Sequence, residues 1–416
     1  MRRLALLALG VLLVVANAPW SRAQRAEAPS TKISRSGTLG GADYLIEVPA
    51  NWRGGLVVFA HGIQRGSGKG TVAPPPIGIH ILGEGHAWAA SGYRASEYHP
   101  HLFIEDLVAL RELFAKEIGK PRWMIIYGLS MGGHIAVASL ELRPGLYQGG
   151  LTECGLVDGI GIADYLMAYT AAAELISGVP LLEAPDRDTF NRILHERVVP
   201  ALGMPGSYTE RGRQFDSVVK YLMGGDQAGH DLPLRIRGLE RRYLMNMMFR
   251  PRDLDNVSNP GLRAASTAHI RYRIDPGLGL TEDELNARVR RIQPAKDARS
   301  PSANPVYAER TGRLTAPLIT LHETGDAWVP LSLEQSYRRR TIAAGTDHLL
   351  VQRVVRGPGH CATDGETRTQ AFDDLVAWIE RGVRPVGEDV LAPDLSRIGL
   401  AYTPVLHLDD PLAPRR

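Results

Sequence analysis

The sequence has no cluster of metal ligands, a small net charge and few long apolar runs. Each of these features argues against a class of protein. Its two cysteines and 13 histidines do not cluster in a metal-binding pattern, so we expect neither a metal nor an organic cofactor. A formal net charge of +3, without a basic block among aromatics, argues against nucleic acid as a partner. The 44% of hydrophobic and 22% of charged residues predict a folded chain rather than a disordered one.

The longest apolar run lies at the N-terminus. Arg2 and Arg3 precede an apolar stretch over residues 4–16, and Ser21-Arg22-Ala23 fits a small-residue cleavage signal. This pattern predicts a removable signal peptide over residues 1–23. A retained anchor is the alternative, but the run is shorter than the roughly 20 residues that span a bilayer. We therefore expect a secreted or periplasmic protein without stable membrane insertion.

Short apolar segments rich in β-branched residues alternate with helical stretches, and this alternation predicts an α/β fold. Residues 56–60 (LVVFA) and 123–127 (WMIIY) have the continuous apolar character of buried parallel strands. Residues 32–36 and 44–48 predict an opening hairpin. The other predicted strands are 86–90, 318–321 and 348–355, and the predicted helices are 103–118, 134–142, 331–343 and 364–379. Thr363 and Glu366 have the spacing of a capping box at the last helix.

The alternation stops between residues 155 and 314, where the sequence becomes irregular, helical and rich in Arg, Met and Pro. We interpret this stretch as an inserted, mainly helical cap, with residues 32–154 and 315–416 forming the core. Long surface loops are the alternative. Within the cap, the Met-rich stretch 243–249 is expected to pack on the core, although it could instead line an acyl pocket. After residue 385 a Pro-rich tail is expected to lie on the core.

A candidate nucleophile lies between the second buried strand and a helix. Gly128-Leu129-Ser130-Met131-Gly132 matches G-x-S-x-G, in which small neighbours allow a tight strand-to-helix turn that exposes the serine hydroxyl. Gly133 gives further room. The strand before the motif and the helix after it supply the context that the motif demands, so we predict that Ser130 is a nucleophile.

Serine needs a base to accept its proton and an acid to orient that base. His360 lies on a loop between the last predicted strand and the closing helix, and no other histidine is placed in this way. Asp326 follows the strand 318–321 and precedes a helix, where a short carboxylate can reach an imidazole. Its rivals as the acid are Glu323, Glu153 and Asp158.

Acyl transfer also needs donors for an oxyanion. We assign this work to the backbone N–H of Met131, the residue after the nucleophile, and to that of Gly62 or Ile63, which follow the strand 56–60. The His61 side chain is expected to make structural hydrogen bonds instead.

Taken together, these motifs resemble those of the α/β-hydrolase superfamily. The HG turn, the GxSxGG elbow, the HxxGDxxVP acid loop and the GH base loop occur in the family's order, within residues 40–155 and 315–382. The resemblance implies a mostly parallel eight-stranded sheet flanked by helices and a two-step mechanism through an acyl-enzyme. The HG turn departs from the HGGG form of some lipases and esterases. In the family's sheet the base loop crosses the region of Cys154, so a disulfide from Cys154 to Cys361 is expected, with two buried free thiols as the alternative.

The residues favour a serine hydrolase that cleaves carboxylic esters, small or derived from polymers, because a serine nucleophile excludes the aspartyl chemistry of dehalogenases. A serine peptidase or amidase on the same scaffold is the alternative. A binding protein without catalytic activity is a third hypothesis, since a fold does not determine a function. The intact set of Ser130, Asp326 and His360 argues against the third.

Overall fold

The computed structural model describes residues 31–226, 248 and 264–403. The predicted signal peptide lies outside these residues, as does the Met-rich stretch 243–249 apart from the buried Met248. None of the described helices is both long enough and apolar enough to cross a membrane.

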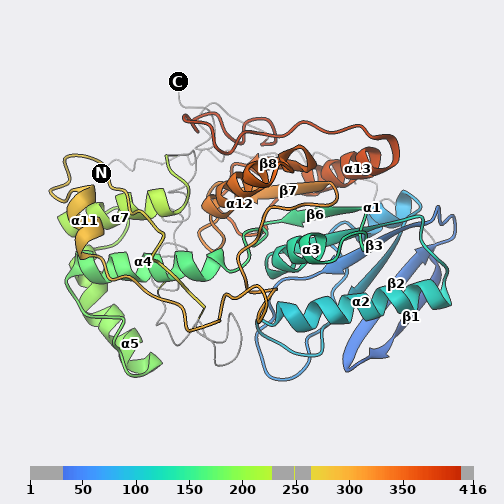
Figure 1. Cartoon of the computed structure of the whole chain (residues 1–416), viewed down its shortest axis with the longest axis horizontal. Coiled ribbons are helices and arrows are strands. Elements are labelled where there is room, and N and C mark those ends of the chain that lie inside the picture. The colour runs from blue at the N-terminus through green and yellow to red at the C-terminus, as the bar shows by residue number, and fades with distance from the viewer. Residues whose placement is uncertain (1–30, 227–247, 249–263, 404–416) are drawn as a thin grey trace, which may run out of the picture.

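A single eight-stranded sheet forms the centre of the core, as predicted (Figure 1). Its order is β1-β2-β4-β3-β5-β6-β7-β8, and every neighbouring pair is parallel except the two pairs made by β2. The strands are β1 (Thr31–Leu39), β2 (Ala42–Pro49), β3 (Gly55–Ala60), β4 (Ala87–Ser91), β5 (Trp123–Leu129), β6 (Gly149–Glu153), β7 (Leu318–Glu323) and β8 (Leu350–Val355).

The inner strands are apolar on both sides because helices cover both faces of the sheet. In β3, for example, Leu56 and Val58 pack on one face while Val57 and Phe59 pack on the other. Helices α2 (Pro100–Glu117), α3 (Met131–Leu142) and α12 (Leu331–Ala344) cover the first face. Helices α1 (Gly78–Gly83) and α13 (Gly365–Arg381) cover the second.

The predicted capping box at α13 is wrong by one residue. Asp364 is the N-cap, and its carboxylate accepts a hydrogen bond from the Thr367 N–H. The Thr363 hydroxyl instead donates to Glu323, one residue before the N-cap.

The helical part extends from the carboxyl ends of the strands, on the left in Figure 1. It contains α4 (Gly161–Ser177), α5 (Arg187–Ile193), a π-helical turn (Leu194–Val198), α6 (Val199–Leu202), α7 (Glu210–Leu222) and α11 (Glu282–Arg288). Helix α4 is almost entirely buried and shares one hydrophobic cluster with α2 and α3. The predicted division between core and cap stays a prediction.

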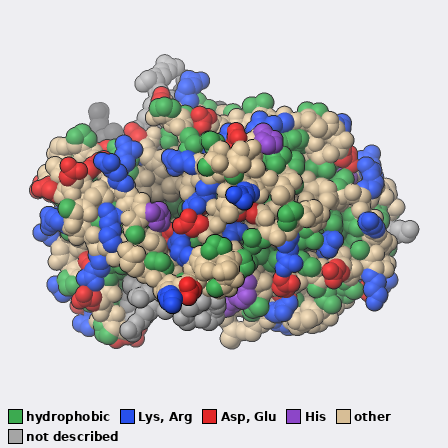
Figure 2. Space-filling view, viewed as in Figure 1, with side chains coloured by type: hydrophobic (Ala, Val, Ile, Leu, Met, Phe, Trp, Pro, Cys, Tyr) green, Lys and Arg blue, Asp and Glu red, His purple; other side chains and the backbone are tan. Residues whose placement is uncertain are grey.

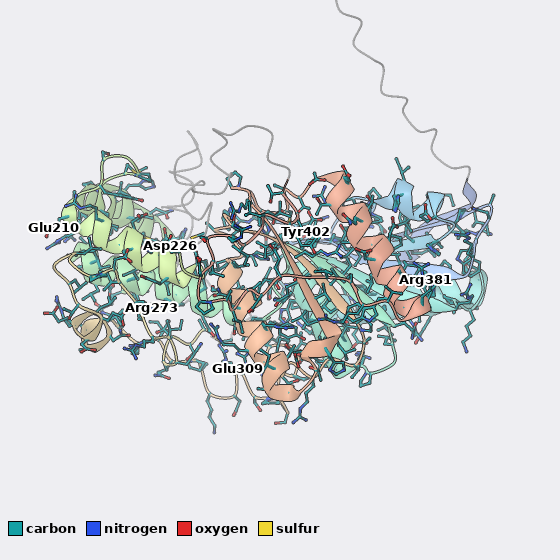
Figure 3. All side chains as sticks on the ribbon, turned by 90° about the horizontal axis from the view of Figure 1, so that it is seen from above. Glu210, Asp226, Arg273, Glu309, Arg381 and Tyr402 are labelled. Atoms are coloured by element: carbon teal, nitrogen blue, oxygen red, sulfur yellow. A yellow bond between two sulfur atoms is a disulfide. The ribbon has the colours of Figure 1, made fainter. Side chains whose placement is uncertain are left out.

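The tail after α13 has no regular element up to residue 403 but packs on the core. Val390, Leu395 and Ile398 contact the end of β8 and the start of α12. The buried Arg356, which follows β8, donates to the carbonyl oxygens of Ser396 and Ile398. Seen from above, Tyr402 lies near the middle of the long axis, between Glu210 and Arg381 (Figure 3).

Candidate active site

The turn that carries Ser130 is set by the shape of its neighbours. Ser130 has a φ of 55° and a ψ of −116° between the end of β5 and the start of α3. A β-carbon at Gly128 or Gly132 would collide with backbone carbonyl oxygens, those of Gly132 and Ala60 respectively, and one at Gly133 would collide with Gly155. Only glycine therefore lets β5, α3 and β3 approach closely enough to close this turn.

Three predicted side chains meet at the carboxyl edge of the sheet. The His360 Nε2 lies 2.9 Å from the Ser130 Oγ, and the His360 Nδ1 lies 2.6 Å from the Asp326 Oδ2. With Asp326 as a carboxylate, Nδ1 carries the proton and Nε2 is left to accept the serine hydroxyl. The structure thus brings together the serine, the base and the acid that the sequence predicts.

Asp326 is itself held rigidly. It is fully buried, and its Oδ1 accepts hydrogen bonds from the N–H groups of Trp328 (2.9 Å) and Val329 (3.0 Å). These two bonds occupy one carboxylate oxygen and leave Oδ2 directed at the imidazole. The carboxylate therefore needs no rearrangement to orient His360.

The electrostatics of the site affect the histidine most directly. Burial lowers the pKa of His360, but the negative charge of Asp326 and its hydrogen bond to Nδ1 outweigh burial, so the pKa lies above its ordinary value. An imidazolium formed during acyl transfer is stabilised by the same two contributions.

The three rival acids have other partners. Glu153 forms a bidentate pair with Arg368, and Asp158 lies 2.9 Å from the Arg340 guanidinium. Glu323 binds the backbone that follows His360 rather than the imidazole. Burial, and then the charge of Asp326, raise the pKa of Glu323.

The predicted oxyanion donors lie on two sides of Ser130. Met131 is the first residue of α3, so its N–H has no acceptor within the helix. A β-carbon on Gly62 would lie 3.7 Å from the Ser130 Oγ, which places the Gly62 backbone beside the hydroxyl. Ile63 follows with a side chain that is 43% exposed. The assignment of these N–H groups to an oxyanion hole stays a prediction.

The His61 side chain makes structural contacts. Its Nδ1 lies 2.6 Å from the carbonyl oxygen of Gly62, and its ring packs on Tyr93 with centroids 4.1 Å apart.

The two cysteines form a disulfide beside the base. Cys154, directly after β6, is bonded to Cys361, and their Cα atoms are 5.1 Å apart. The neighbouring Arg368 was not predicted from the sequence: it pairs with Glu153 and donates to the carbonyl oxygen of Cys361 at 3.1 Å. From the sequence alone, an arginine on an amphipathic helix that pairs with a carboxylate cannot be distinguished from one that is exposed to solvent.

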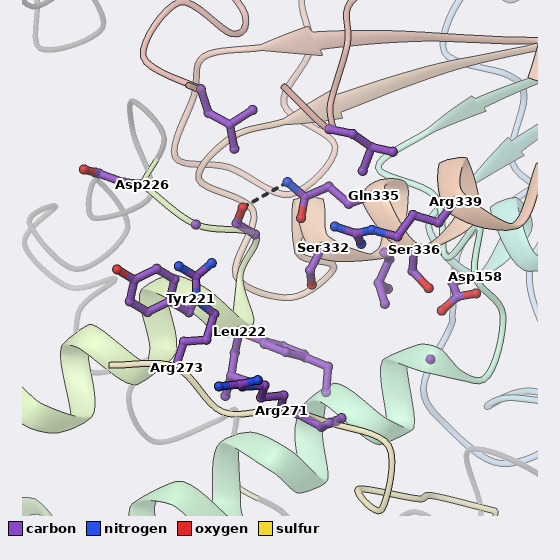
Figure 4. A pocket seen from close by; sticks show the side chains of 18 of the residues that line it. Asp158, Tyr221, Leu222, Asp226, Arg271, Arg273, Ser332, Gln335, Ser336 and Arg339 are labelled. Carbon is purple, nitrogen blue, oxygen red and sulfur yellow. Dashed lines mark hydrogen bonds between the residues drawn. The ribbon is translucent and has the colours of Figure 1, made fainter. Parts of the chain in front are cut away.

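A polar cavity of about 800 Å³ lies apart from this chemistry, between α4, α7, α12 and the tail (Figure 4). Figure 2 shows a hollow on this face between α7 and α12. Asp158, Arg273 and Arg339 are among the described residues of its wall, whereas Ser130, Asp326 and His360 are not. We therefore place the site at the three side chains and not at this cavity.

Comparisons with known proteins find similar chains whose names denote different chemistry. No protein-family model matches. An o-phthalyl amidase from Xanthobacter agilis is 23% identical over 408 residues, which cover 84% of this chain and 87% of that protein. A feruloyl esterase B from Aspergillus oryzae is 12% identical with a TM-score of 0.47, covering 84% and 80% of the two chains. An acylaminoacyl peptidase from Pyrococcus horikoshii is 12% identical with a TM-score of 0.43, covering 88% and 44%.

The arrangement of the strands and the order of the three side chains along the chain identify the fold. A mostly parallel eight-stranded sheet carries a serine turn after β5, an aspartate after β7 and a histidine after β8, in the chain order Ser, Asp, His. This sheet topology and this order of residues are those of the α/β-hydrolase fold.

Proposed function

We propose that the protein is an exported serine hydrolase that cleaves carboxylic esters. The observation that supports this most directly is the pair of hydrogen bonds that joins Ser130 to His360 and His360 to Asp326. Such an arrangement lets a weakly acidic hydroxyl lose its proton at the moment of attack.

In the proposed reaction the Ser130 Oγ attacks the ester carbonyl while the His360 Nε2 takes the hydroxyl proton. The N–H groups of Met131 and of Gly62 or Ile63 stabilise the oxyanion. His360 then gives its proton to the leaving alkoxide, which departs as an alcohol and leaves an acyl group on Ser130. A water molecule, deprotonated by His360, releases the acid and restores the serine.

The first test asks whether Ser130 is the nucleophile. A fluorophosphonate probe should label the wild-type protein and leave Ser130→Ala unlabelled, and Ser130→Ala should lose at least about 10³-fold in hydrolysis of p-nitrophenyl butyrate. Equal labelling of the two proteins would rule out Ser130. No labelling and no hydrolysis by the folded wild type would favour the binding-protein hypothesis.

Amide hydrolysis is the second candidate, and one observation favours it: the curated relative that matches most of the chain is named an amidase. Two substrates with the same acyl group separate the candidates, namely p-nitrophenyl butyrate and butyryl p-nitroanilide. Hydrolysis of the ester alone supports the esterase. If the anilide or a monoamide of phthalic acid is cleaved with a kcat/KM at least equal to that of the matching ester, the protein is an amidase.

Export rests on the N-terminal charge and apolar pattern and on a disulfide, which persists in oxidising compartments. Expression in a bacterium with an export pathway, followed by cell fractionation and N-terminal sequencing, tests it. The expected product is outside the cytoplasm and begins at Gln24. A full-length product confined to the cytoplasm would contradict export.

A further inference from the structure

We propose that Glu323 is a positioning residue for the base, holding the loop that carries His360 in register with Asp326. This inference rests on the proposed function, because it concerns the same serine, histidine and aspartate. It concerns a carboxylate that does not touch the reacting atoms.

The contacts of Glu323 fall on the backbone just after His360. One carboxylate oxygen, Oε1, accepts hydrogen bonds from the Ala362 N–H (2.7 Å), the Thr363 N–H (2.8 Å) and the Thr363 hydroxyl (2.8 Å). Glu323 is 1% exposed and Thr363 is 2% exposed. Hydrogen bonds to a buried carboxylate are stronger than neutral ones, so this oxygen fixes the segment two and three residues beyond the base.

The same turn also holds the segment before His360. The Thr324 N–H donates to the Val355 carbonyl oxygen at 2.9 Å, and the Gly325 N–H donates to the Gly357 carbonyl oxygen at 2.8 Å. The loop from Val355 to Thr363 is therefore attached on both flanks to residues 323–325. Asp326, which binds the tip of the loop, is the next residue in the chain. One short turn thus sets both the position of the loop and the position of the acid.

A separate set of contacts joins the base loop to the serine. The disulfide and the Arg368–Glu153 pair hold Cys361 against the end of β6, and the carbonyl oxygen of Glu153 accepts the Ser130 N–H at 3.1 Å. The two sets of contacts position His360 relative to different residues. Contacts of Glu323 set the distance from His360 to Asp326, and contacts around Cys361 set the distance from His360 to Ser130.

The chain offers a matched control. Glu141 in α3 also accepts hydrogen bonds from two backbone N–H groups and a threonine hydroxyl, those of Thr311 and Gly312 at 2.8 to 3.0 Å. Its carboxylate side chain is 2% exposed. The loop that Glu141 holds carries none of the three active-site side chains, so Glu141→Ala measures what losing such a carboxylate costs without moving the base.

The experiment compares kcat and KM for p-nitrophenyl butyrate in Glu323→Ala, Glu323→Gln and Glu141→Ala. We expect Glu323→Ala to lose on the order of 10²-fold in kcat with KM changed less than threefold, because a base displaced by about 1 Å costs this much. Glu323→Gln keeps an acceptor oxygen and should retain at least a tenth of the kcat. Glu141→Ala should retain kcat within about threefold, although its melting temperature falls.

The pH profile supplies a readout that a purely structural role would not move. Besides Asp326, the charges of Glu323 and His322 act on His360, and the negative charge of Glu323 raises its pKa. The acidic limb of the kcat/KM profile should therefore move to lower pH in Glu323→Gln and stay in place in Glu141→Ala. If Glu323→Ala does not fold, this shift decides the question.

Two outcomes overturn the inference: a kcat for Glu323→Ala within threefold of Glu141→Ala, or an unmoved acidic limb in Glu323→Gln. Both require that the wild type hydrolyses the ester and is labelled at Ser130. A wild type that does neither refutes the proposed function itself, so the two failures are distinguishable.

Discussion

The serine turn and the base loop hold their side chains by opposite means. The turn at Ser130 is closed by the absence of side chains, because glycines on both sides let three backbones meet. The loop at His360 is irregular and is held by bonds: a disulfide to the distant Cys154, hydrogen bonds to the buried Glu323, and a hydrogen bond from the nearby Arg368. Close packing of the backbone therefore positions Ser130, whereas a disulfide and hydrogen bonds position His360. Perturbations of the two regions should therefore differ in what they damage.

The largest effect is expected from the acid that holds the tip of the base loop. Asp326→Asn should lower kcat by roughly 10⁴-fold, equivalent to about 5 kcal/mol of transition-state stabilisation. The amide N–H₂ favours the tautomer in which the His360 Nε2 carries the proton, and that nitrogen cannot then accept one from Ser130. Ester hydrolysis and the thermal melting curve measure this. A kcat within tenfold of the wild type would show that the base is oriented by other groups.

The next effect concerns the covalent link. The double variant Cys154→Ser/Cys361→Ser opens a cross-link between residues 207 apart and should lose roughly 4 kcal/mol of unfolding free energy or less. The kcat should fall as well, because Cys361 adjoins His360. Urea unfolding measures the loss, and a thiol reductant should destabilise the wild type but leave the double variant unchanged. A reductant effect on both proteins would mean that it acts elsewhere.

A smaller loss is expected from the serine turn. Gly132→Ala forces a β-carbon against the Ala60 carbonyl oxygen and should destabilise the fold by about 1–3 kcal/mol. Gly83→Ala in α1 is the control, because a β-carbon there meets no atom within 4 Å. Unfolding curves compare the two variants. If Gly132→Ala were as stable as the control, the claim that shape closes this turn would be wrong.

The smallest effect is expected in the pH dependence of kcat/KM, which should depend on the protonation of His360 in the base loop. Below its pKa, His360 is protonated and cannot accept the serine proton, so kcat/KM should fall with an acidic limb centred above the ordinary histidine pKa of 6.5. Near the serine turn, burial lowers the pKa of His134 to about 3, so His134 stays neutral over this range. An acidic limb centred below pH 6.5 would mean that burial, rather than the charge of Asp326, has the larger effect on the pKa of His360.

The same contrast explains how much could be predicted from the sequence. The serine turn is encoded locally, since strand, glycines and helix are contiguous, and residues 123–142 could be assigned correctly almost throughout. The candidates His360 and Asp326 followed from their places after β8 and β7. Prediction succeeded for β3 and β5 because buried parallel strands are continuously apolar, whereas β6, which contains two glycines, a threonine and a glutamate, was given no range.

Apart from the disulfide, which the family resemblance implied, the contacts of the base loop could not be predicted in this way. Arg368 and Glu153 are 215 residues apart, and neither residue has a local pattern that reveals its partner. Glu323 was considered only as a rival acid, because a carboxylate after a strand can orient an imidazole as readily as it can bind backbone. Thr363 was assigned as the helix cap because Thr363 and the adjacent Asp364 are both suitable N-cap residues, and the contact of Thr363 with the distant Glu323 leaves no local pattern.

The packing of the tail has a practical consequence for making the protein. The last regular element ends at Arg381, so a truncation designed from secondary structure would stop there. It would remove the carbonyl oxygens that receive the Arg356 guanidinium and the Thr403 hydroxyl that accepts the Arg356 N–H, leaving a cation uncovered four residues ahead of His360. Expression boundaries should therefore be set beyond Thr403, and a C-terminal purification tag belongs after that residue.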